Sequence, residues 1–219
     1  MFPDKMTIDH LANQKLAIKE MIQLVYALSR FENDQATLHE TETIILGSDV
    51  YGLTNDDMQI IRRLQSAVEL VIRNDRPASL TVLNAINARV VKGESMAGGT
   101  LRTGTVKISG THYVPPIPDE EQTRADIQQI LTAPQTSTAK ALRMILYVAG
   151  HRLYWSGNKR TAFLFANYLM VQAGVGLVMV ADSQVAAFNR LLTRYYDTAD
   201  GDELMQWLYD NCVMRDSNQ

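Results

Sequence analysis

Apolar residues recur at intervals of three and four along most of this chain, the spacing that places side chains on one face of an α-helix. Two stretches show it most clearly: Leu11, Ile18, Met21, Ile22, Val25 and Leu28, and then Ile60, Ile61, Leu64, Val68 and Val71. Thr54 precedes the second stretch and is a residue type that caps helix N-termini. Further helices are expected over about residues 78–92, 119–131, 137–150 and 158–174, and after Asp182 and Asp202. The pattern predicts an all-α fold.

The segment from Gly93 to Thr111 interrupts the helical pattern. It is rich in glycine, and residues 105–114 alternate in a way that is typical of a short β-strand pair. The prolines that follow, up to Pro118, cannot continue a central strand. The sequence therefore predicts a small β-hairpin before the C-terminal half.

Length, charge and cysteine content exclude several classes of protein. The 219 residues fit one domain, or one domain with a helical extension. A net charge of -3 gives no basic footprint for nucleic acid, and no apolar run reaches the length of a membrane span. The N-terminus lacks the apolar stretch of a secretory signal, and a single cysteine, Cys212, suits a reducing compartment. We expect a cytoplasmic protein.

The segment His151–Ala162 lies between two predicted helices and carries the strongest chemical signal. Glycine and asparagine at a helix start present backbone N–H groups to an anion, and Lys159 and Arg160 add positive charge there. A guanidinium also binds two phosphate oxygens at once. These residues fit a phosphate site, and they fit equally a capped helix with two solvated basic side chains.

The run from Gly157 to Ala162 resembles the core of the Fic/Doc (Fido) family signature, His-Pro-Phe-x-Asp/Glu-Gly-Asn-Gly/Lys-Arg. The likeness extends to the glycine-rich turn that ends at Arg102 and to the stretch Ile108–Pro116, and it covers about residues 40–213. It implies a Fic-like helical bundle with a β-hairpin flap before the motif helix. It also divides the chain into an N-terminal helical extension, residues 1–40, and a Fic-like domain, residues 41–215.

The resemblance implies transfer of AMP, or a related phosphate-containing group, from ATP to a hydroxyl of a target protein. It assigns the phosphates to Ser156, Gly157, Asn158, Lys159 and Arg160. The flap would align the target by strand addition. The flap residues implied in target binding are Lys107, Ile108, His112 and Tyr113.

Two departures from the family pattern bear on activity. Arg152 occupies the aligned position of the family histidine, and arginine stays protonated at neutral pH. A one-residue bulge would bring His151 to the site as the general base; alternatively, His151 only ends a helix. Ser156 replaces the acidic Mg²⁺ ligand, so Mg²⁺ would arrive with ATP, held by its phosphates. We predict no metal site formed by the protein alone.

Self-inhibition is a third point of comparison. Many family members block their nucleotide site with a glutamate, and the segment Thr41–Gly47 resembles the region that carries it. Leu46 stands where that glutamate would be, and leucine cannot pair with Arg160. This form of self-inhibition is therefore expected to be absent.

Three functions remain open. The first is a nucleotide-dependent transferase acting on an unknown target protein. The second is a catalytically degenerate Fic-fold protein that binds nucleotide or protein without transfer, and the third is one component of a toxin–antitoxin-type pair. Apolar helix faces are explained equally well by core packing and by a homodimer face. Arg102 would either contact nucleotide or brace the loop.

Overall fold

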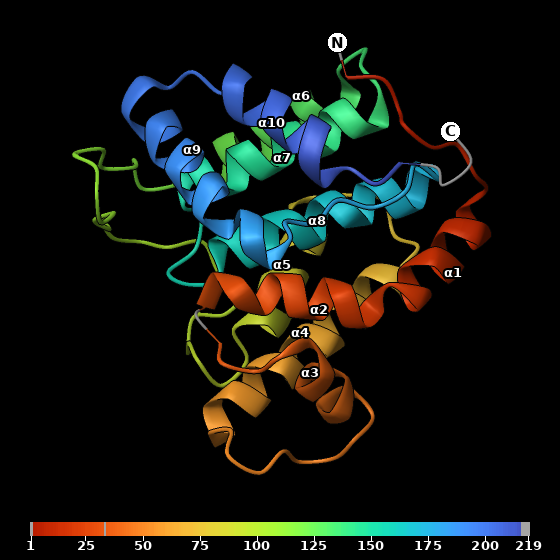
Figure 1. Ribbon diagram of the computed structural model, residues 1–219. Coiled ribbons are helices and arrows are strands. Elements are labelled where there is room, and N and C mark those ends of the chain that lie inside the picture. The colour runs from red at the N-terminus through yellow and green to blue at the C-terminus, as the bar shows by residue number, and fades with distance from the viewer. Residues whose placement is uncertain (1, 33, 216–219) are drawn as a thin grey trace.

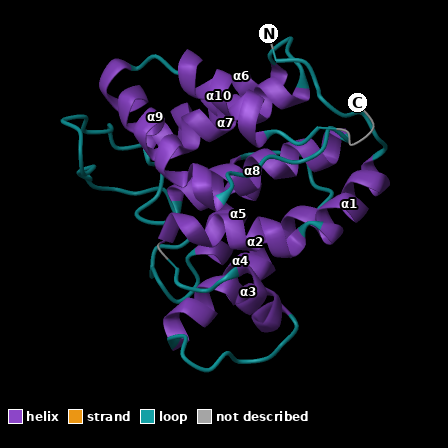
Figure 2. Cartoon of the chain, in the orientation of Figure 1, coloured by secondary structure: helices purple, strands orange, loops and turns teal. Residues whose placement is uncertain are grey.

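The computed structural model describes residues 2–32 and 34–215, and this part of the chain consists of helices joined by loops (Figure 1; Figure 2). Two short 3₁₀ helices, η1 (Arg30–Glu32) and η2 (Asp182–Gln184), accompany the α-helices. The α-helices are α1 (His10–Lys19), α2 (Met21–Ser29), α3 (Leu38–Ile45), α4 (Asn55–Arg73), α5 (Leu80–Val90), α6 (Glu120–Thr132), α7 (Ser137–His151), α8 (Asn158–Ala173), α9 (Val185–Thr198) and α10 (Asp202–Cys212). The all-α prediction is confirmed.

Helix α8 is the centre of the molecule. Most of its side chains are buried, from Phe163 and Phe165 near its start to Met170 and Val171 near its end. It packs against α7 on one side and against α1, α2, α4 and α5 on the other. Figure 1 shows α8 between a layer that contains α6, α7 and α10 and a layer that contains α2, α3 and α4. A helix that is apolar on nearly all sides must be enclosed in this way.

Helix starts follow the local chemistry of the sequence. The side-chain oxygens of Thr37, Thr54, Ser79, Asp119 and Thr136 each accept a hydrogen bond from a backbone N–H in the first turn. These bonds satisfy donors that the helix itself leaves free. The expected cap at Thr54 is therefore present. Gly174 follows α8 with φ 69°, a conformation that suits glycine.

The expected β-hairpin over residues 105–114 is absent. In the described part of the chain, the one β-type pairing is an isolated bridge between Val178 and Val213. A two-stranded hairpin with no sheet to join is marginal in water. The loop is instead anchored by its side chains, because the Thr111 hydroxyl donates to Asp197 and the Tyr113 ring stacks on Tyr196 at 5.7 Å.

The N-terminal helices share the main core. Leu24, Val25 and Leu28 of α2 are buried, and the Phe31 ring stacks on Phe163 of α8 with centroids 5.3 Å apart. Asn13 of α1 is buried and exchanges two hydrogen bonds with the backbone of residue 176. No described helix has the length and apolar character needed to cross a membrane.

Candidate functional site

The loop between α7 and α8 turns sharply at two residues with positive φ. Arg152 has φ 48° directly after α7, and Gly157 has φ 74° directly before α8. A side chain at position 157 would place its Cβ 2.7 Å from a methyl carbon of Val91, so only glycine fits. The Asn158 side chain is buried and bonds both the N–H and the C=O of Tyr154, at 2.8 and 2.7 Å. Asn158 therefore fixes the loop from within.

A second buried asparagine supports the loop from α5. Asn87 Nδ2 donates to the Ser156 carbonyl and to the Thr161 hydroxyl, each at 3.1 Å, and Asn87 Oδ1 accepts from the Gly99 N–H at 2.9 Å. Sequence reasoning did not select Asn87. The sequence feature that could have indicated it is a polar residue within the apolar stripe of a predicted helix. A buried amide needs hydrogen-bond partners, so such a residue is expected to contact other polar groups.

Arg160 is fully buried, and its guanidinium is held between two carboxylates. Arg160 Nε lies 2.8 Å from Glu32 Oε1, and Arg160 Nη2 lies 3.2 Å from Glu94 Oε1. Glu32 belongs to η1, and Glu94 follows α5. Arg160 is therefore not the solvated basic side chain that the alternative interpretation of this segment expected. Negative groups already occupy the position at which the sequence placed phosphate.

A glutamate does pair with Arg160, but it is not at position 46, where the resemblance located the inhibitory residue of the family. Leu46 ends α3 and is 77% exposed, whereas Glu32 lies nearer the N-terminus and reaches Arg160 directly. The sequence comparison located the inhibitory segment at residues 41–47, whereas in the structure η1 supplies the glutamate that contacts Arg160. The sequence feature that could have indicated this role is the position of Glu32, an acidic residue directly after the apolar stretch of α2.

Burial shifts the pKa values of the ionisable groups around Arg160. Desolvation raises the pKa of Glu32, and the Arg160 charge opposes that shift. Desolvation also lowers the pKa of Lys159, which the Glu32 charge partly offsets. Lys159 Nζ donates to Asn189 at 3.2 Å and lies 5.3 Å from the centroid of the Phe31 ring. Lys159 is thus tied to α9 and η1 beside the two carboxylates.

His151 and Arg152 stand at the end of α7 and share a neighbour, Tyr196. The His151 ring hydrogen-bonds through Nδ1 to the Tyr147 carbonyl at 2.9 Å and lines a cavity of about 120 Å³ with the tyrosines Tyr113, Tyr195 and Tyr196. The charge of Arg152 lowers the pKa of Lys159, and its buried Nε has no hydrogen-bond partner among the described residues. Burial raises the pKa of Tyr196, and the Arg152 charge and its hydrogen bond to Tyr196 oppose that shift, so Arg152 also borders the cavity of His151.

Comparison with solved structures identifies this arrangement of helices. A fragment of Fic-1 from C. elegans superposes with a TM-score of 0.74 at 17% identity, covering 87% of this chain and 59% of that one. A Fic domain containing signaling protein from Bacteroides thetaiotaomicron gives 0.71 at 13% identity, covering 90% and 85%. A Fic family protein from Desulfovibrio desulfuricans gives 0.72 at 16% identity, covering 90% and 62%. The chain has the Fic fold.

Searches with the whole sequence found no match to a known family. No protein-family model matches the chain, and no curated protein is similar enough in sequence to match it. The chain spans about three fifths of the length of the C. elegans Fic-1 fragment. At 13–17% identity, the likeness of these Fic structures is a likeness of fold.

Within the Fic fold, Ser156 lies beside a carboxylate from another segment. Its hydroxyl donates to Glu94 Oε1, and Arg63 of α4 approaches Glu94 Oε2 at 3.6 Å. Glu94 thus links Ser156, Arg160 and Arg63. No group of three or more His, Cys, Asp or Glu residues in the described chain has the geometry to hold a metal ion. A hydroxyl and a carboxylate are, however, oxygen donors of the kind Mg²⁺ accepts.

Arg102 joins the flap loop to the start of the loop between α7 and α8, because it donates to backbone carbonyls of both. Its buried guanidinium donates only to carbonyls, among them those of Arg152 at 2.6 Å and Pro115 at 3.0 Å. Two of the predicted flap contacts, Lys107 and His112, are exposed. The other two, Ile108 and Tyr113, are half-buried and pack on the core. The four residues share one loop, as predicted, but they form no strand.

Proposed function

We propose that this chain is a Fic-type transferase that moves AMP, or a related phosphate-containing group, from a nucleotide to a hydroxyl of a partner protein, with ATP as donor. The observation that supports the proposal best is the buried guanidinium of Arg160 at the N-terminus of α8, already paired with two carboxylates. Phosphate oxygens are also negatively charged and accept two-pronged hydrogen bonds from a guanidinium, as the Glu94 carboxylate does here. Backbone N–H groups at the start of α8 add to the attraction.

In the proposed reaction, the target hydroxyl attacks the α-phosphorus of ATP, the bond to the β-phosphate breaks, and pyrophosphate leaves. Such transfers depend mainly on positioning and charge stabilisation. Residues Gly157 to Arg160 would hold the phosphates, and Arg152 would add a fixed charge. Mg²⁺ would neutralise phosphate charge when it is bound by the phosphates of ATP.

The proton of the target hydroxyl needs an acceptor, and we assign that role to His151. Its Nδ1–H donates to the Tyr147 carbonyl, which leaves the lone pair on Nε2 as the basic atom. Tyr113 of the flap lines the same small cavity, so a target segment on the flap would lie beside this ring. Arg152, at the aligned position, has no lone pair to accept a proton.

We further propose that the described conformation is a blocked resting state. Glu32 and Glu94 occupy the Arg160 guanidinium, so nucleotide phosphates would have to displace both. The carboxylates would repel phosphate as well as cover its partner. Activation therefore requires movement of η1 and of the loop that follows α5.

A catalytically degenerate Fic-fold protein is the second candidate, including the binding half of a toxin–antitoxin-type pair. It is favoured by Arg152 at the aligned histidine position and by Ser156 at the acidic one. Such a protein would keep the anion site and transfer nothing.

Calorimetric titration with ATP, with and without Mg²⁺, tests the proposal. The double variant Glu32→Ala with Glu94→Ala should bind at least about tenfold more tightly than wild type, because repulsion is removed and Arg160 is freed. Adding Arg160→Ala should abolish that gain. Glu120→Ala with Glu203→Ala, two exposed glutamates on α6 and α10, is the matched control and should leave affinity unchanged.

Incubation of the unblocked double variant with α-labelled ATP separates the two candidates. Labelled protein that disappears in the His151→Ala variant would support transfer with His151 as base. Tight binding without label, in the presence of a cell lysate as target source, would favour the degenerate protein. Failure of the double variant to bind any nucleotide would contradict the transferase and leave only a Fic-fold protein that binds protein.

A further inference from the structure

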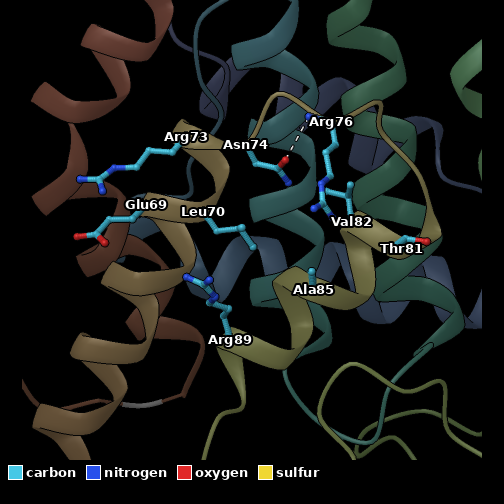
Figure 3. Close-up of a pocket in the computed structure, with 9 residues that line it drawn as sticks. All are labelled: Glu69, Leu70, Arg73, Asn74, Arg76, Thr81, Val82, Ala85 and Arg89. Atoms are coloured by element: carbon cyan, nitrogen blue, oxygen red, sulfur yellow. Dashed lines mark hydrogen bonds between the residues drawn. The ribbon is translucent and has the colours of Figure 1, made fainter.

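Helices α4 and α5 enclose a basic groove on the surface of the molecule. Two adjoining pockets of about 480 and 880 Å³ form it, and they share Ala85 and Arg89. Figure 3 shows the first pocket, with Arg73 and Leu70 on α4, Arg89 on α5 and Arg76 on the connecting loop. We call this feature the α4/α5 groove. Its basic lining residues are Arg62, Arg63, Arg73, Arg76, Arg89 and Lys92.

The positive charge of the groove is only partly neutralised by its own neighbours. Glu69 is the one acidic residue among the groups that line it, although the whole chain carries a net charge of -3. In the described chain, Arg62 pairs with Asp49, and Arg63 pairs with Glu94. The remaining four basic side chains form no ion pair with a described carboxylate. Positive charge concentrated in a cleft attracts an anionic partner.

The floor and length of the groove suit an extended chain. Ala85 and Ala88 of α5 present only methyl groups, so a ligand backbone would approach closely. Lining residues run along α4 from Gln59 to Arg73, which corresponds to about 20 Å of helix. That is the span of about six residues of extended polypeptide. The Arg89 guanidinium donates to Ser66 Oγ at 3.2 Å and crosses from one wall to the other.

We propose that the α4/α5 groove binds an acidic, Asp- or Glu-rich segment of a protein partner. Guanidinium groups pair with carboxylates through two parallel hydrogen bonds, and five of the six basic lining residues are arginines. No aromatic side chain lines the groove, so it lacks the stacking surfaces by which single-stranded nucleic acid is held. The proposal concerns a surface outside the nucleotide site and does not depend on transferase activity.

The groove also adjoins the blocked guanidinium. Arg63 lines the groove and contacts Glu94, which in turn contacts Arg160. A carboxylate that binds Arg63 would compete with Glu94 for it. The bound segment would therefore be connected to the proposed phosphate site through Arg63 and Glu94.

Fluorescence anisotropy with a labelled oligoglutamate peptide, at low ionic strength and without nucleotide, tests the proposal. Wild type should bind, and Arg73→Glu with Arg76→Glu should weaken binding at least about tenfold. Lys92→Glu, at the other end of the groove, should weaken it separately. Arg143→Glu with Arg190→Glu carries the same change of charge on exposed residues outside the groove and should bind like wild type. Circular dichroism of each variant confirms that it is folded.

Three results would overturn the proposal. Oligoglutamate that fails to bind wild type excludes an acidic segment as ligand. Equal weakening in the groove variant and in the control variant shows attraction to overall charge rather than to this groove. An oligouridylate or tripolyphosphate that binds the groove more tightly than oligoglutamate assigns it to nucleic acid or to a small polyanion instead.

Discussion

Asp34 shows how a single residue can make the stability of this molecule depend on pH. Its side chain is buried, Oδ1 accepts from the Ala36 N–H at 2.8 Å, and Oδ2 has no partner among the described residues. Burial raises its pKa to about 6. The Arg30 charge opposes the shift, and the charges of Asp57 and Glu40 add to it. The folded protein therefore holds this proton to a higher pH than the unfolded chain does.

We expect the contribution of Asp34 to stability to fall as pH rises from about 4 to about 6, because over this range the unfolded state loses its proton first. Relative to wild type, Asp34→Asn should gain up to about 3 kcal/mol in free energy of unfolding across that interval. Urea unfolding at several pH values measures the difference.

Glu40→Gln serves as the control of opposite sign for the Asp34 experiment. Hydrogen bonds from Thr37 lower the pKa of Glu40, so its contribution is present above the unfolded pKa and is lost in acid. That variant should therefore lose stability relative to wild type as pH rises. A wild-type minus Asp34→Asn difference that stays constant with pH would show that Asp34 titrates normally.

At the scale of elements, Arg102 determines where the flap loop lies. Carbonyls of the loop and of the end of α7 converge on one buried guanidinium, including those of Gly104, Pro116 and His151. A loop without strand pairing has few other constraints. The single arginine thus replaces the ladder of hydrogen bonds that a β-hairpin would have formed.

Arg102→Lys should free the flap while the helices remain folded. An ammonium group has three donors and cannot reach this spread of carbonyls, so some are left buried without a partner. We expect a loss of about 2–3 kcal/mol in stability. Hydrogen exchange should become faster over residues 103–116 and stay slow in α7 and α8. Arg143→Lys, at an exposed position of α7, is the control, and unchanged flap protection would refute the bracing role.

At the scale of the whole molecule, the N-terminal helices complete the core. Phe31 packs on both Phe163 and Phe188, and Gln14 of α1 donates to the Ile72 carbonyl of α4 at 2.7 Å. The same segment supplies Glu32 to the candidate site. Residues before 41 therefore belong to the structural unit that positions Arg160.

A chain that begins at residue 41 should fail to unfold cooperatively. Loss of α1, α2 and η1 removes the helices that pack on one side of α4 and α8, so apolar side chains buried there become exposed. Thermal unfolding followed by circular dichroism distinguishes the outcomes, with Phe31→Ala in the full chain as the milder comparison. A sharp transition in the shortened chain would establish residues 41–215 as an independent domain.

Local chemistry was readable from the sequence. Apolar periodicity predicted the helices, Thr54 marked a helix start, and the glycine-asparagine loop was correctly placed at the start of α8. Each of these features depends on residues within a few positions of one another. Such local patterns can be recognised without knowing how distant segments pack.

Tertiary structure alone decided what surrounds that loop. Glu32 and Glu94 meet at Arg160 from distant segments, Asn87 reaches Ser156 from α5, and the stretch that alternates like a strand finds no partner to pair with. The positive φ of Arg152 turns the chain directly after α7. The sequence by itself determined the helices and the loop, because those depend on neighbouring residues. The partners of Arg160 and the fate of the flap depend on packing between distant segments, which no local pattern encodes.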